Sequence, residues 1–564
     1  MKKITRLFGS LLILLMTVSS CSKETYETTE VTKYVYIVIT DSNGKNPSQE
    51  GWYTKNNDGT YTKSSDTTAQ PGVTYYKQTN SSSETPLGPT ISDGIQQADE
   101  FAQYALSIYY LWNKEIASAI EKDLDPDTCT DPVATVEKIR YKDGGGYNSN
   151  KDEDRWTQLF EDITPFEESV QGVATTNGLN LSVGSFTGSS PQSYFFIVNL
   201  VYANSPAAKA GLKRGDIIVS YKGKDITDAN LEDAYYGESA AEYGLGSWEE
   251  DGIHDSDKSV TLNPVKMYLD PVICSKTFDV DGKKVGYLMY DSFDLDSAKK
   301  LIEVCKQFKS EGVKELILDL RYNGGGYVFT EELMASMFAP AANVKAGELY
   351  MEEIYNEVLT EAFSEQSGKN FNKTYLSFDH EMGKEGSEGH LKYNTEDANI
   401  GLDKIYAIVD SNTASASESL LVGLSPFVDI VTIGQQSHGK YCTGYILSTG
   451  DVYETVPTAI SKWGIYVMVA TYADRDGKNL ARPVGIVPSV EAEDTPWDGY
   501  DVGNENETML KAALSAAGKK YALKATTRSL DLRPRIDLKP MHNKYKFGKR
   551  IKQLPPLQKE IALR

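Results

Sequence analysis

The sequence predicts an α/β fold divided among several domains. The chain has 564 residues, of which 40% are hydrophobic, and strand, helix and strand patterns follow one another between residues 284 and 320. A chain of this length exceeds one ordinary domain and can bury several cores, which excludes wholesale disorder. A β-α-β order places two strands in parallel, with candidate sites at their carboxyl ends.

The first twenty residues have the features of a secretory signal. Three basic residues precede an apolar run that ends at Val18 and is too short to span a bilayer. The segment then reads V-S-S-C, which resembles a lipobox with Cys21 as the lipidated residue. We therefore expect residues 1–20 to be removed and the mature chain to hang from a lipid anchor; a plainly secreted protein is the alternative. Because Ser22 rather than Asp follows the cysteine, resemblance to Gram-negative lipoproteins favours the outer membrane of the cell envelope.

The composition argues against several classes of partner. The chain carries 58 basic and 80 acidic residues, a formal net charge of -22, which disfavours nucleic acid as a ligand because phosphates attract Lys and Arg. The cysteines form no C-x-x-C pair and no histidine lies at zinc-finger spacing. The sequence thus implies no nucleic-acid partner, no metal and no organic cofactor, and it does not specify an oligomeric state.

Two segments precede the first recognisable motif. Residues 21–90 are rich in Thr, Tyr, Ser and Gly, and the alternation in Val31–Thr40 is typical of a strand. The N-G and D-G pairs at Asn43-Gly44 and Asp58-Gly59 predict hairpins, so we expect a β-rich module or stalk. Residues 91–168 have apolar residues at helical spacing and predict a helical segment.

Residues 169–268 resemble a bacterial PDZ domain. The resemblance rests on S-P-A-A-K-A-G-L-K-R-G-D-I-I, which begins at Ser205 and combines a short helix, a glycine turn and a strand. PDZ domains bind extended peptide ends by strand addition beside a carboxylate-binding loop. The candidate loop is a weakened form of the usual pattern and consists of Gly178, Leu179, Asn180 and Leu181. A purely structural spacer is the alternative, and residues 232–258 have the composition of an insertion.

The chemistry is predicted between residues 270 and 495. A strand over Lys284–Phe293, a helix with its apolar face between Ala298 and Phe308, and a buried strand over Glu315–Leu320 form the β-α-β unit. The second strand runs into D-L-R-Y-N-G-G-G, Asp319–Gly326. Glycines leave backbone N–H groups uncovered, so this loop can face a developing oxyanion; an ordinary turn before a helix is the alternative.

A second candidate site follows the strand Lys404–Asp410. There the sequence T-A-S-A-S-E places Ser415 at a strand-to-helix turn, where a serine can act as a nucleophile near the positive end of a helix. The same S-x-x-E pattern, Ser415 to Glu418, is also a capping box, which requires no catalysis. Local sequence alone leaves both interpretations open.

Together these motifs resemble the S41 family of C-terminal processing, or tail-specific, serine peptidases. D-L-R-x-N-x-G-G, T-A-S-A-S-E and G-K follow a PDZ domain in this order, over roughly residues 169–495. The resemblance implies a crotonase-like α/β peptidase core over residues 269–500 with an associated PDZ domain. It leaves residues 501–564 as a basic C-terminal tail, whose stretch from Lys519 carries 14 basic and 3 acidic residues. We expect this tail to be a solvated end, or a contact for anionic lipid or for the chain's own acidic surface.

The resemblance also assigns the catalytic residues. The family's nucleophile corresponds to Ser415, and its lysine base, 25 residues later, corresponds to Lys440. The family's oxyanion hole corresponds to a backbone N–H of Gly325 or Gly326 together with that of Ala416. A lysine can serve as a base only if burial holds its pKa well below the usual value near 10.4.

Two positions depart from the family pattern. Many S41 enzymes have a Gln four residues after the lysine, where this chain has Gly444, so another residue, water or nothing takes that place. His438, two residues before the lysine, is an alternative base because histidine is the commoner proton acceptor.

The sequence therefore predicts a lipid-anchored serine endopeptidase that cleaves unfolded or tail-exposed cell-envelope proteins after PDZ capture. The alternative is a non-catalytic lipoprotein that binds peptides or other ligands on the same scaffold.

Overall fold

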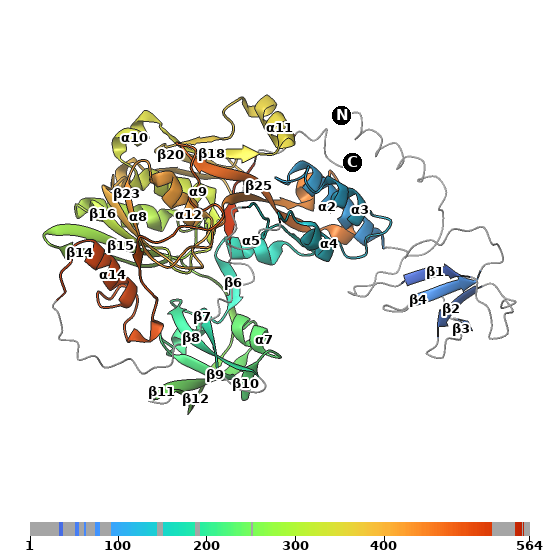
Figure 1. The fold of residues 1–564 in the computed structure, drawn as a ribbon, viewed down its shortest axis with the longest axis horizontal. Helices are drawn as coiled ribbons and strands as arrows, with labels where there is room; N and C mark the ends of the chain where they lie inside the picture. The colour runs from blue at the N-terminus through green and yellow to red at the C-terminus, as the bar shows by residue number, and fades with distance from the viewer. Residues whose placement is uncertain are drawn as a thin grey trace. The chain divides into compact units, whose positions relative to one another are not determined.

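The computed structural model describes most of the chain (Figure 1). The described residues are 92–143, 151–186, 192–249, 252–387, 389–521, 548–554 and 557, with the backbone of four N-terminal strands. The chain divides into two compact units, residues 1–96 with 126–130 and all other residues. Within the described part, no helix is both long and apolar enough to cross a membrane. The predicted signal segment and Cys21 lie outside the described residues.

The N-terminal unit contains the predicted β-rich module. Its four strands pair in the order β1-β4-β2-β3. Their bounds are β1 Lys33–Ile37, β2 Gly51–Lys55, β3 Tyr61–Lys63 and β4 Thr74–Gln78. Strands β2 and β3 are antiparallel neighbours, which confirms the hairpin predicted at Asp58-Gly59. The hairpin predicted at Asn43-Gly44 is wrong, because β1 pairs in parallel with β4 and is not a neighbour of β2.

The predicted helical segment contains four helices. They are α2 Asp93–Ile108, α3 Ala117–Asp123, α4 Pro132–Ile139 and α5 Thr164–Val170. Helix α2 buries Phe101, Ala102, Ala105 and Leu106, as its spacing predicted. Between α4 and α5 the short strand β5, Gln158–Phe160, pairs with the peptidase strand β25, Gly464–Asp474, so this segment is joined to the catalytic core.

The predicted PDZ domain forms a six-stranded sheet with the order β12-β11-β9-β10-β8-β7. The strands are β7 Leu179–Ser185, β8 Ser193–Val201, β9 Ile217–Tyr221, β10 Lys224–Thr227, β11 Ala241–Glu249 and β12 Gly252–Leu262. Two short helices accompany it, α6 Pro206–Lys209 and α7 Leu231–Tyr236. Residues 232–258, expected to be an insertion, instead supply most of α7, β11 and part of β12, and β11 pairs with β9 inside the sheet. A ladder of β6, Val173–Thr176, with β13, Val265–Tyr268, closes the domain where it meets the rest of the chain.

The core predicted over residues 269–500 is built on a largely parallel sheet with the order β14-β15-β16-β22-β23-β26. Its strands are β14 Val272–Val280, β15 Lys283–Tyr290, β16 Glu315–Asp319, β22 Lys404–Val409, β23 Asp429–Gly434 and β26 Val490–Glu491. Only β14 is antiparallel to its neighbour. The parallel pairing of β15 with β16 confirms the predicted β-α-β unit, whose helix is α8, Ala298–Ser310.

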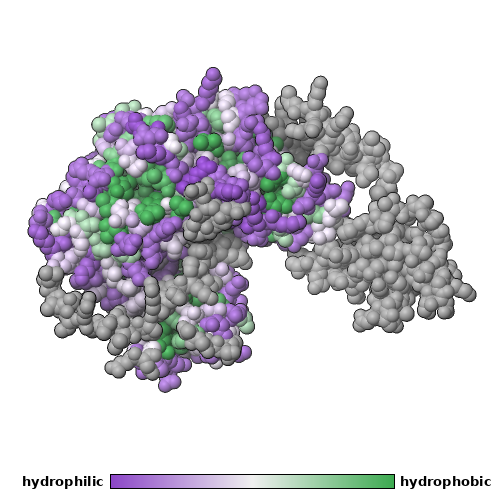
Figure 2. All heavy atoms as spheres, in the orientation of Figure 1, coloured by the Kyte–Doolittle hydropathy of each residue, from purple (hydrophilic) through white to green (hydrophobic). Residues whose placement is uncertain are grey.

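Helices cover both faces of this sheet. Apolar residues of α8, α9 (Val328–Phe338) and α12 (Ala416–Leu424) form one core with the sheet. Apolar residues of α14 (Thr508–Ala516) form the core on the opposite face. Outside these cores, hydrophilic side chains are spread over the visible face of the described part, with smaller hydrophobic areas between them (Figure 2).

A second sheet crosses the catalytic region in the order β17-β27-β24-β25-β18-β19. Its remaining bounds are β17 Gly325–Tyr327, β18 Leu349–Tyr355, β19 Lys373–Tyr375, β24 Cys442–Ser448 and β27 Lys549–Ile551. The presence of β27 corrects the expectation for the tail. The described parts of residues 501–564 include α14 on the core and a strand inside this sheet, so they are not a solvated end. Lys549 and Arg550 are buried because hydroxyl and carboxylate groups of the core bind them.

Candidate active site

Ser415 lies in the turn between strand β22 and helix α12. Its backbone has φ +65° and ψ -114°, a conformation that costs a non-glycine residue about 1–3 kcal/mol and persists only where the surroundings enforce it. The residue is fully buried, and its Oγ has no hydrogen-bond partner among the described residues. Ser415 and Glu418 form the capping box that the S-x-x-E pattern predicts, in which the Glu418 carboxylate accepts from the backbone N–H of Ser415.

Glu418 connects this turn to the loop that carries the predicted base. Its carboxylate accepts hydrogen bonds from the backbone N–H of Ser415 at 2.8 Å, of Gly439 at 2.7 Å and of Lys440 at 2.9 Å, and from the hydroxyl of Ser437. Burial raises the pKa of Glu418 to about 7 despite these donors. The acid of the S-x-x-E pattern thus serves the helix turn and fixes the lysine loop at the same time. The sequence analysis identified Glu418 only as a capping residue.

Lys440 is fully buried. Its Nζ donates to the hydroxyl of Tyr466 at 2.7 Å and to the carbonyl oxygen of Gly548, and it lies 4.7 Å from the centre of the Tyr466 ring and 5.3 Å from that of Trp156. Burial lowers the pKa of Lys440 to about 8. An amine with this pKa is partly neutral near neutral pH, which is the requirement for a proton acceptor.

Tyr466 fills the space in which the family's glutamine would stand. A Cβ atom on Gly444 would lie 2.2 Å from the Tyr466 ring, so residue 444 in β24 must be glycine while β25 carries this tyrosine. The tyrosine hydroxyl, rather than a glutamine side chain, contacts the amine of Lys440. Tyr466 could not be identified from the sequence. The only signal was glycine at residue 444 in place of the family's glutamine, and its meaning depends on which strands pair.

Gly325 and Ala416, two of the three residues predicted to form the oxyanion hole, lie next to Ser415. A Cβ atom on Gly325, whose φ is +99°, would lie 2.9 Å from Ala416 N and 2.9 Å from Ser415 Cβ, so these three residues adjoin one another. The N–H of Gly325 donates to Asn323 Oδ1 at 2.9 Å. A Cβ on Gly326 would instead lie 2.3 Å from the carbonyl of Phe293. Glycine is therefore required at both positions by close backbone approach.

His438, the alternative base, belongs to the loop that carries Lys440. Its backbone N–H donates to Thr413 O at 2.9 Å, and its Nε2 accepts from the indole N–H of Trp156 at 3.4 Å. The two rings meet edge to face with centroids 6.1 Å apart. Across the described residues, no group of three or more His, Cys, Asp and Glu side chains is placed to hold a metal ion.

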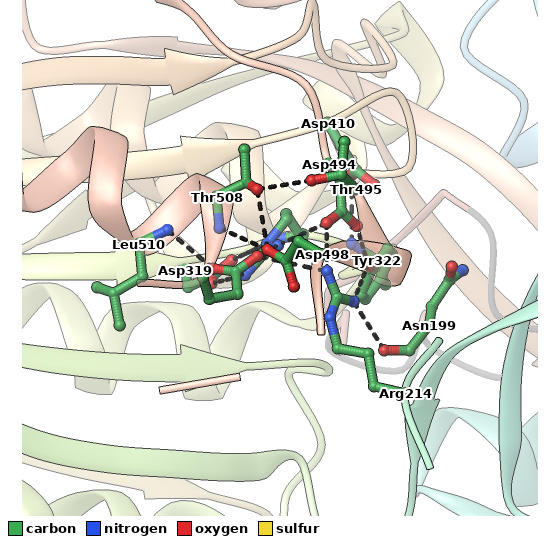
Figure 3. Close-up of polar contacts among 12 residues, drawn as sticks. Asn199, Arg214, Asp319, Tyr322, Asp410, Asp494, Thr495, Asp498, Thr508 and Leu510 are labelled. Carbon is green, nitrogen blue, oxygen red and sulfur yellow. Dashed lines mark hydrogen bonds and ion pairs between the residues drawn. The ribbon is translucent and has the colours of Figure 1, made fainter. Parts of the chain in front are cut away.

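A buried ion network holds the D-L-R loop (Figure 3). Arg321 donates to Asp319 at 2.7 Å, to Glu507 at 2.8 Å and to Asp494 at 3.0 Å. Burial by itself would lower the pKa of Arg321, but the three carboxylates raise it above its usual value. Arg214 of the PDZ domain contacts the same Asp494 at 2.5 Å. The loop that ends at the glycines is therefore fixed by charges from distant parts of the chain.

The candidate carboxylate loop of the PDZ domain forms the start of β7. Gly178 has φ +76° and its Cβ would lie 2.1 Å from Ser205 Cβ, so glycine is required there. Leu179, Asn180 and Leu181 belong to β7, the last strand in the order of the described sheet, and Asn180 Oδ1 accepts from Asn199 at 2.9 Å. An edge strand can pair with an added peptide strand.

Comparisons with known proteins agree with this architecture. The sequence profile of Peptidase family S41 matches residues 284–492, and that of the PDZ domain matches residues 197–241. The carboxyl-terminal-processing protease of Picosynechococcus sp. is 23% identical over 377 residues, which cover 66% of this chain and 77% of that protein. The protein of the same name from Synechocystis sp. is 23% identical over 342 residues, which cover 60% and 69%.

A solved structure shares the fold. An S41 protease from Bacteroides fragilis superposes with a TM-score of 0.55 at 22% identity, covering 74% of this chain and 96% of that one. Both predicted domains are thus present in one chain, and the relatives that share them are carboxyl-terminal processing proteases. The chain therefore contains a peptidase domain of family S41 and a PDZ domain, and it is a serine-type peptidase that acts on polypeptides.

Proposed function

We propose that Ser415 and Lys440 form the catalytic pair of an endopeptidase that cleaves unfolded or tail-exposed polypeptides. The observation that carries this proposal is the bridge made by Glu418, whose carboxylate binds the backbone N–H of both residues. A buried carboxylate shared by two loops fixes their relative position, which a nucleophile and its base require.

The proposed reaction uses these groups in the following order. Neutral Lys440 accepts the proton of Ser415 Oγ as the oxygen attacks the peptide carbonyl, and the backbone N–H of Ala416 faces the oxyanion that develops. The lysine ammonium then protonates the leaving amine, and water releases the acyl group by the same steps in reverse. In the present arrangement the lysine amine bonds to Tyr466 and Gly548, so it must turn toward Ser415 for the reaction.

The test compares two serines of the same motif. Ser415→Ala should abolish both cleavage of a denatured protein and labelling by a fluorophosphonate. Ser417→Ala is the matched control and should retain both, because the Ser417 hydroxyl already donates to Asn323 O at 3.1 Å. An active Ser415→Ala chain would contradict the assignment, and absence of labelling even in chains whose Ser415 has been made accessible would favour the non-catalytic alternative.

We also propose that the PDZ domain captures the free carboxyl end of a substrate by strand addition to β7. The position of β7 at the sheet edge and the glycine turn at Gly178 support this. A long substrate with a free C-terminal carboxylate should be cleaved with a higher kcat/KM than the same substrate amidated at its end. Equal values would remove the capture role, and short peptides serve as the control because they need no capture.

We further propose that Cys21 anchors the mature protein in the cell envelope, at the outer membrane of a Gram-negative bacterium. The support is the sequence V-S-S-C after an apolar segment, with Ser22 next. Cys21→Ser should move the protein from the membrane fraction to the soluble fraction, whereas Cys129→Ser should not. Unchanged membrane association in Cys21→Ser would contradict the anchor.

A further inference from the structure

The strand β27 lies across the catalytic site. It is inserted between β17, which carries Gly325 and Gly326, and β24, which begins two residues after Lys440. The register pairs Gly325 with Lys549 and Gly444 with Ile551. An extended segment in this position runs between the glycine loop and the base loop, where a peptide substrate has to lie.

The backbone of β27 makes the contacts expected of a bound peptide. Lys549 N–H donates to Gly324 O at 2.8 Å, and Lys552 N–H donates to Gly444 O at 3.1 Å. The position of a Cβ on Gly325 is 2.2 Å from Lys549 O and 2.9 Å from Ala416 N. The Lys549 carbonyl is therefore next to the serine turn, where the scissile carbonyl of a substrate would be attacked.

The same strand accounts for the state of the catalytic pair. Gly548 O accepts a hydrogen bond from Lys440 Nζ, so the base is bound to the tail. Ser415 is fully buried and its Oγ has no partner in the described part of the chain. A substrate cannot reach Ser415 in an extended conformation while β27 occupies this slot.

A charged pocket receives the side chain that follows Lys549. The Arg550 guanidinium donates to Glu331 at 3.0 Å, to Glu353 at 2.7 Å and to Ser419 Oγ at 3.0 Å, and it lies 4.7 Å from the Tyr472 ring centre. Both glutamates are buried. Glu353 also binds Lys552 of the same segment, so departure of the segment removes two cations from these buried carboxylates, which is costly. A peptide that replaces β27 is therefore favoured if it brings an arginine to the same position.

We propose that the slot between β17 and β24 is the substrate-binding slot, that residues Gly548–Lys552 occupy it as an inhibitor in cis, and that Glu331 and Glu353 select peptides with arginine after the scissile carbonyl. This inference rests on the proposed function, since it assigns the access route to Ser415. It differs from that proposal in its consequence: the chain is held inactive until its own strand leaves.

The first experiment releases the strand in the full-length chain. Lys549→Pro removes the N–H that bonds Gly324 and should speed fluorophosphonate labelling of Ser415 by tenfold or more. A strand docked in about 99% of molecules leaves about 1% competent, so full release raises the rate up to about 100-fold. Gln553→Pro is the matched control, because residue 553 is exposed and lies outside β27; its labelling rate should stay near that of the wild type.

The second experiment refills the slot. A synthetic peptide of residues 546–554, KFGKRIKQL, added to the Lys549→Pro chain should restore slow labelling, and the same peptide with glutamate in place of arginine should inhibit at least tenfold more weakly. Equal inhibition by both peptides would overturn the arginine selectivity. A folded Lys549→Pro chain that labels no faster than wild type would overturn the inhibitor role.

A third measurement tests the proposal even if the Lys549→Pro chain does not fold. In the full-length Ser415→Ala chain, saturating KFGKRIKQL should accelerate hydrogen exchange at the Lys549 and Lys552 amides of β27, because the peptide displaces them. Unchanged protection would overturn the proposal. Failure of the proposed function is distinguishable: it predicts no labelling of Ser415 in any variant, whether or not the strand is released.

Discussion

Two buried arginines flank the catalytic turn, and they differ in how the chain delivers them. Arg321 follows β16 directly, and its carboxylate partners Asp319, Asp494 and Glu507 belong to the core of the peptidase unit. Arg550 is brought by a strand of three residues, β27, and binds Glu331 and Glu353. The same chemistry thus fixes a loop permanently in one place and docks a removable strand in the other. Arg321 stays in place because its loop belongs to the core, whereas Arg550 can leave because it lies on a short strand.

The largest effect is expected at Lys440, whose amine contacts the docked strand. Lys440→Arg should lower the rate of peptide hydrolysis by about 100- to 10,000-fold, the usual contribution of general acid–base catalysis, because a guanidinium stays protonated. In the wild type the base works deprotonated, so the rate should rise with pH through about 8, the pKa that burial gives Lys440. The pH–rate profile measures this. Retained activity in Lys440→Arg with loss in His438→Ala would transfer the role of base to the histidine.

Removal of the permanently fixed arginine should be next in size. Arg321→Ala leaves three acids without their shared cation, and breaking a buried ion pair in this way costs about 3–5 kcal/mol of unfolding free energy. Urea denaturation measures the loss. Arg475→Ala is the control, because Arg475 is partly exposed and pairs with Glu348, and exposed pairs contribute about 0–1 kcal/mol. Similar losses of unfolding free energy in both variants would contradict the permanent structural role assigned to Arg321.

Arg550→Ala should cost less, about 1–3 kcal/mol, because β27 can leave and water can then reach the glutamates. At the same time the labelling of Ser415 should increase, whereas Arg321→Ala should decrease it by distorting the glycine loop. Urea denaturation and the labelling rate give the two readouts. If Arg550→Ala destabilises as much as Arg321→Ala and also slows labelling, both arginines are permanent parts of the core.

The smallest effect is expected for Tyr466→Phe. The hydroxyl accepts a hydrogen bond from the Lys440 ammonium at 2.7 Å and stabilises the charged form, so its removal should lower the pKa of Lys440 and move the rising limb of the pH–rate profile to lower pH. Loss of a hydrogen bond to a charged group, about 1.5 kcal/mol, corresponds to a shift of that limb by about one pH unit. Gly444→Gln combined with Tyr466→Ala places an amide near the lysine and should move the limb back toward its wild-type position. An unchanged profile would limit Tyr466 to packing.

Much of the core could be predicted because its signals are local. The alternation and helical spacing between Lys284 and Leu320 predicted β15, α8 and β16 within a few residues, and the parallel pairing followed from their order. The spacing of Ser415 and Lys440 became meaningful only through the resemblance of the whole motif set to a family. Their catalytic roles remain predictions.

The rest depends on contacts between distant residues. Residues 549–551, K-R-I, have no alternation that predicts a strand, and their burial depends on acids more than 190 residues away in sequence. A basic stretch was therefore expected at the surface, where isolated charges are normally found. Tyr466 escaped prediction for the same reason, since only the pairing of β24 with β25 brings it beside Gly444.

The four hydrogen bonds to Glu418 have a consequence for how related chains can diverge. Three are donated by the loop of Ser437, Gly439 and Lys440, and one by the turn of Ser415, so a single side chain sets the spacing of the two catalytic residues. A homologue that keeps its serine and lysine but has lost this acid would hold both residues out of register. The acid at this position is thus a marker that separates working peptidases from descendants that retain only the ability to bind.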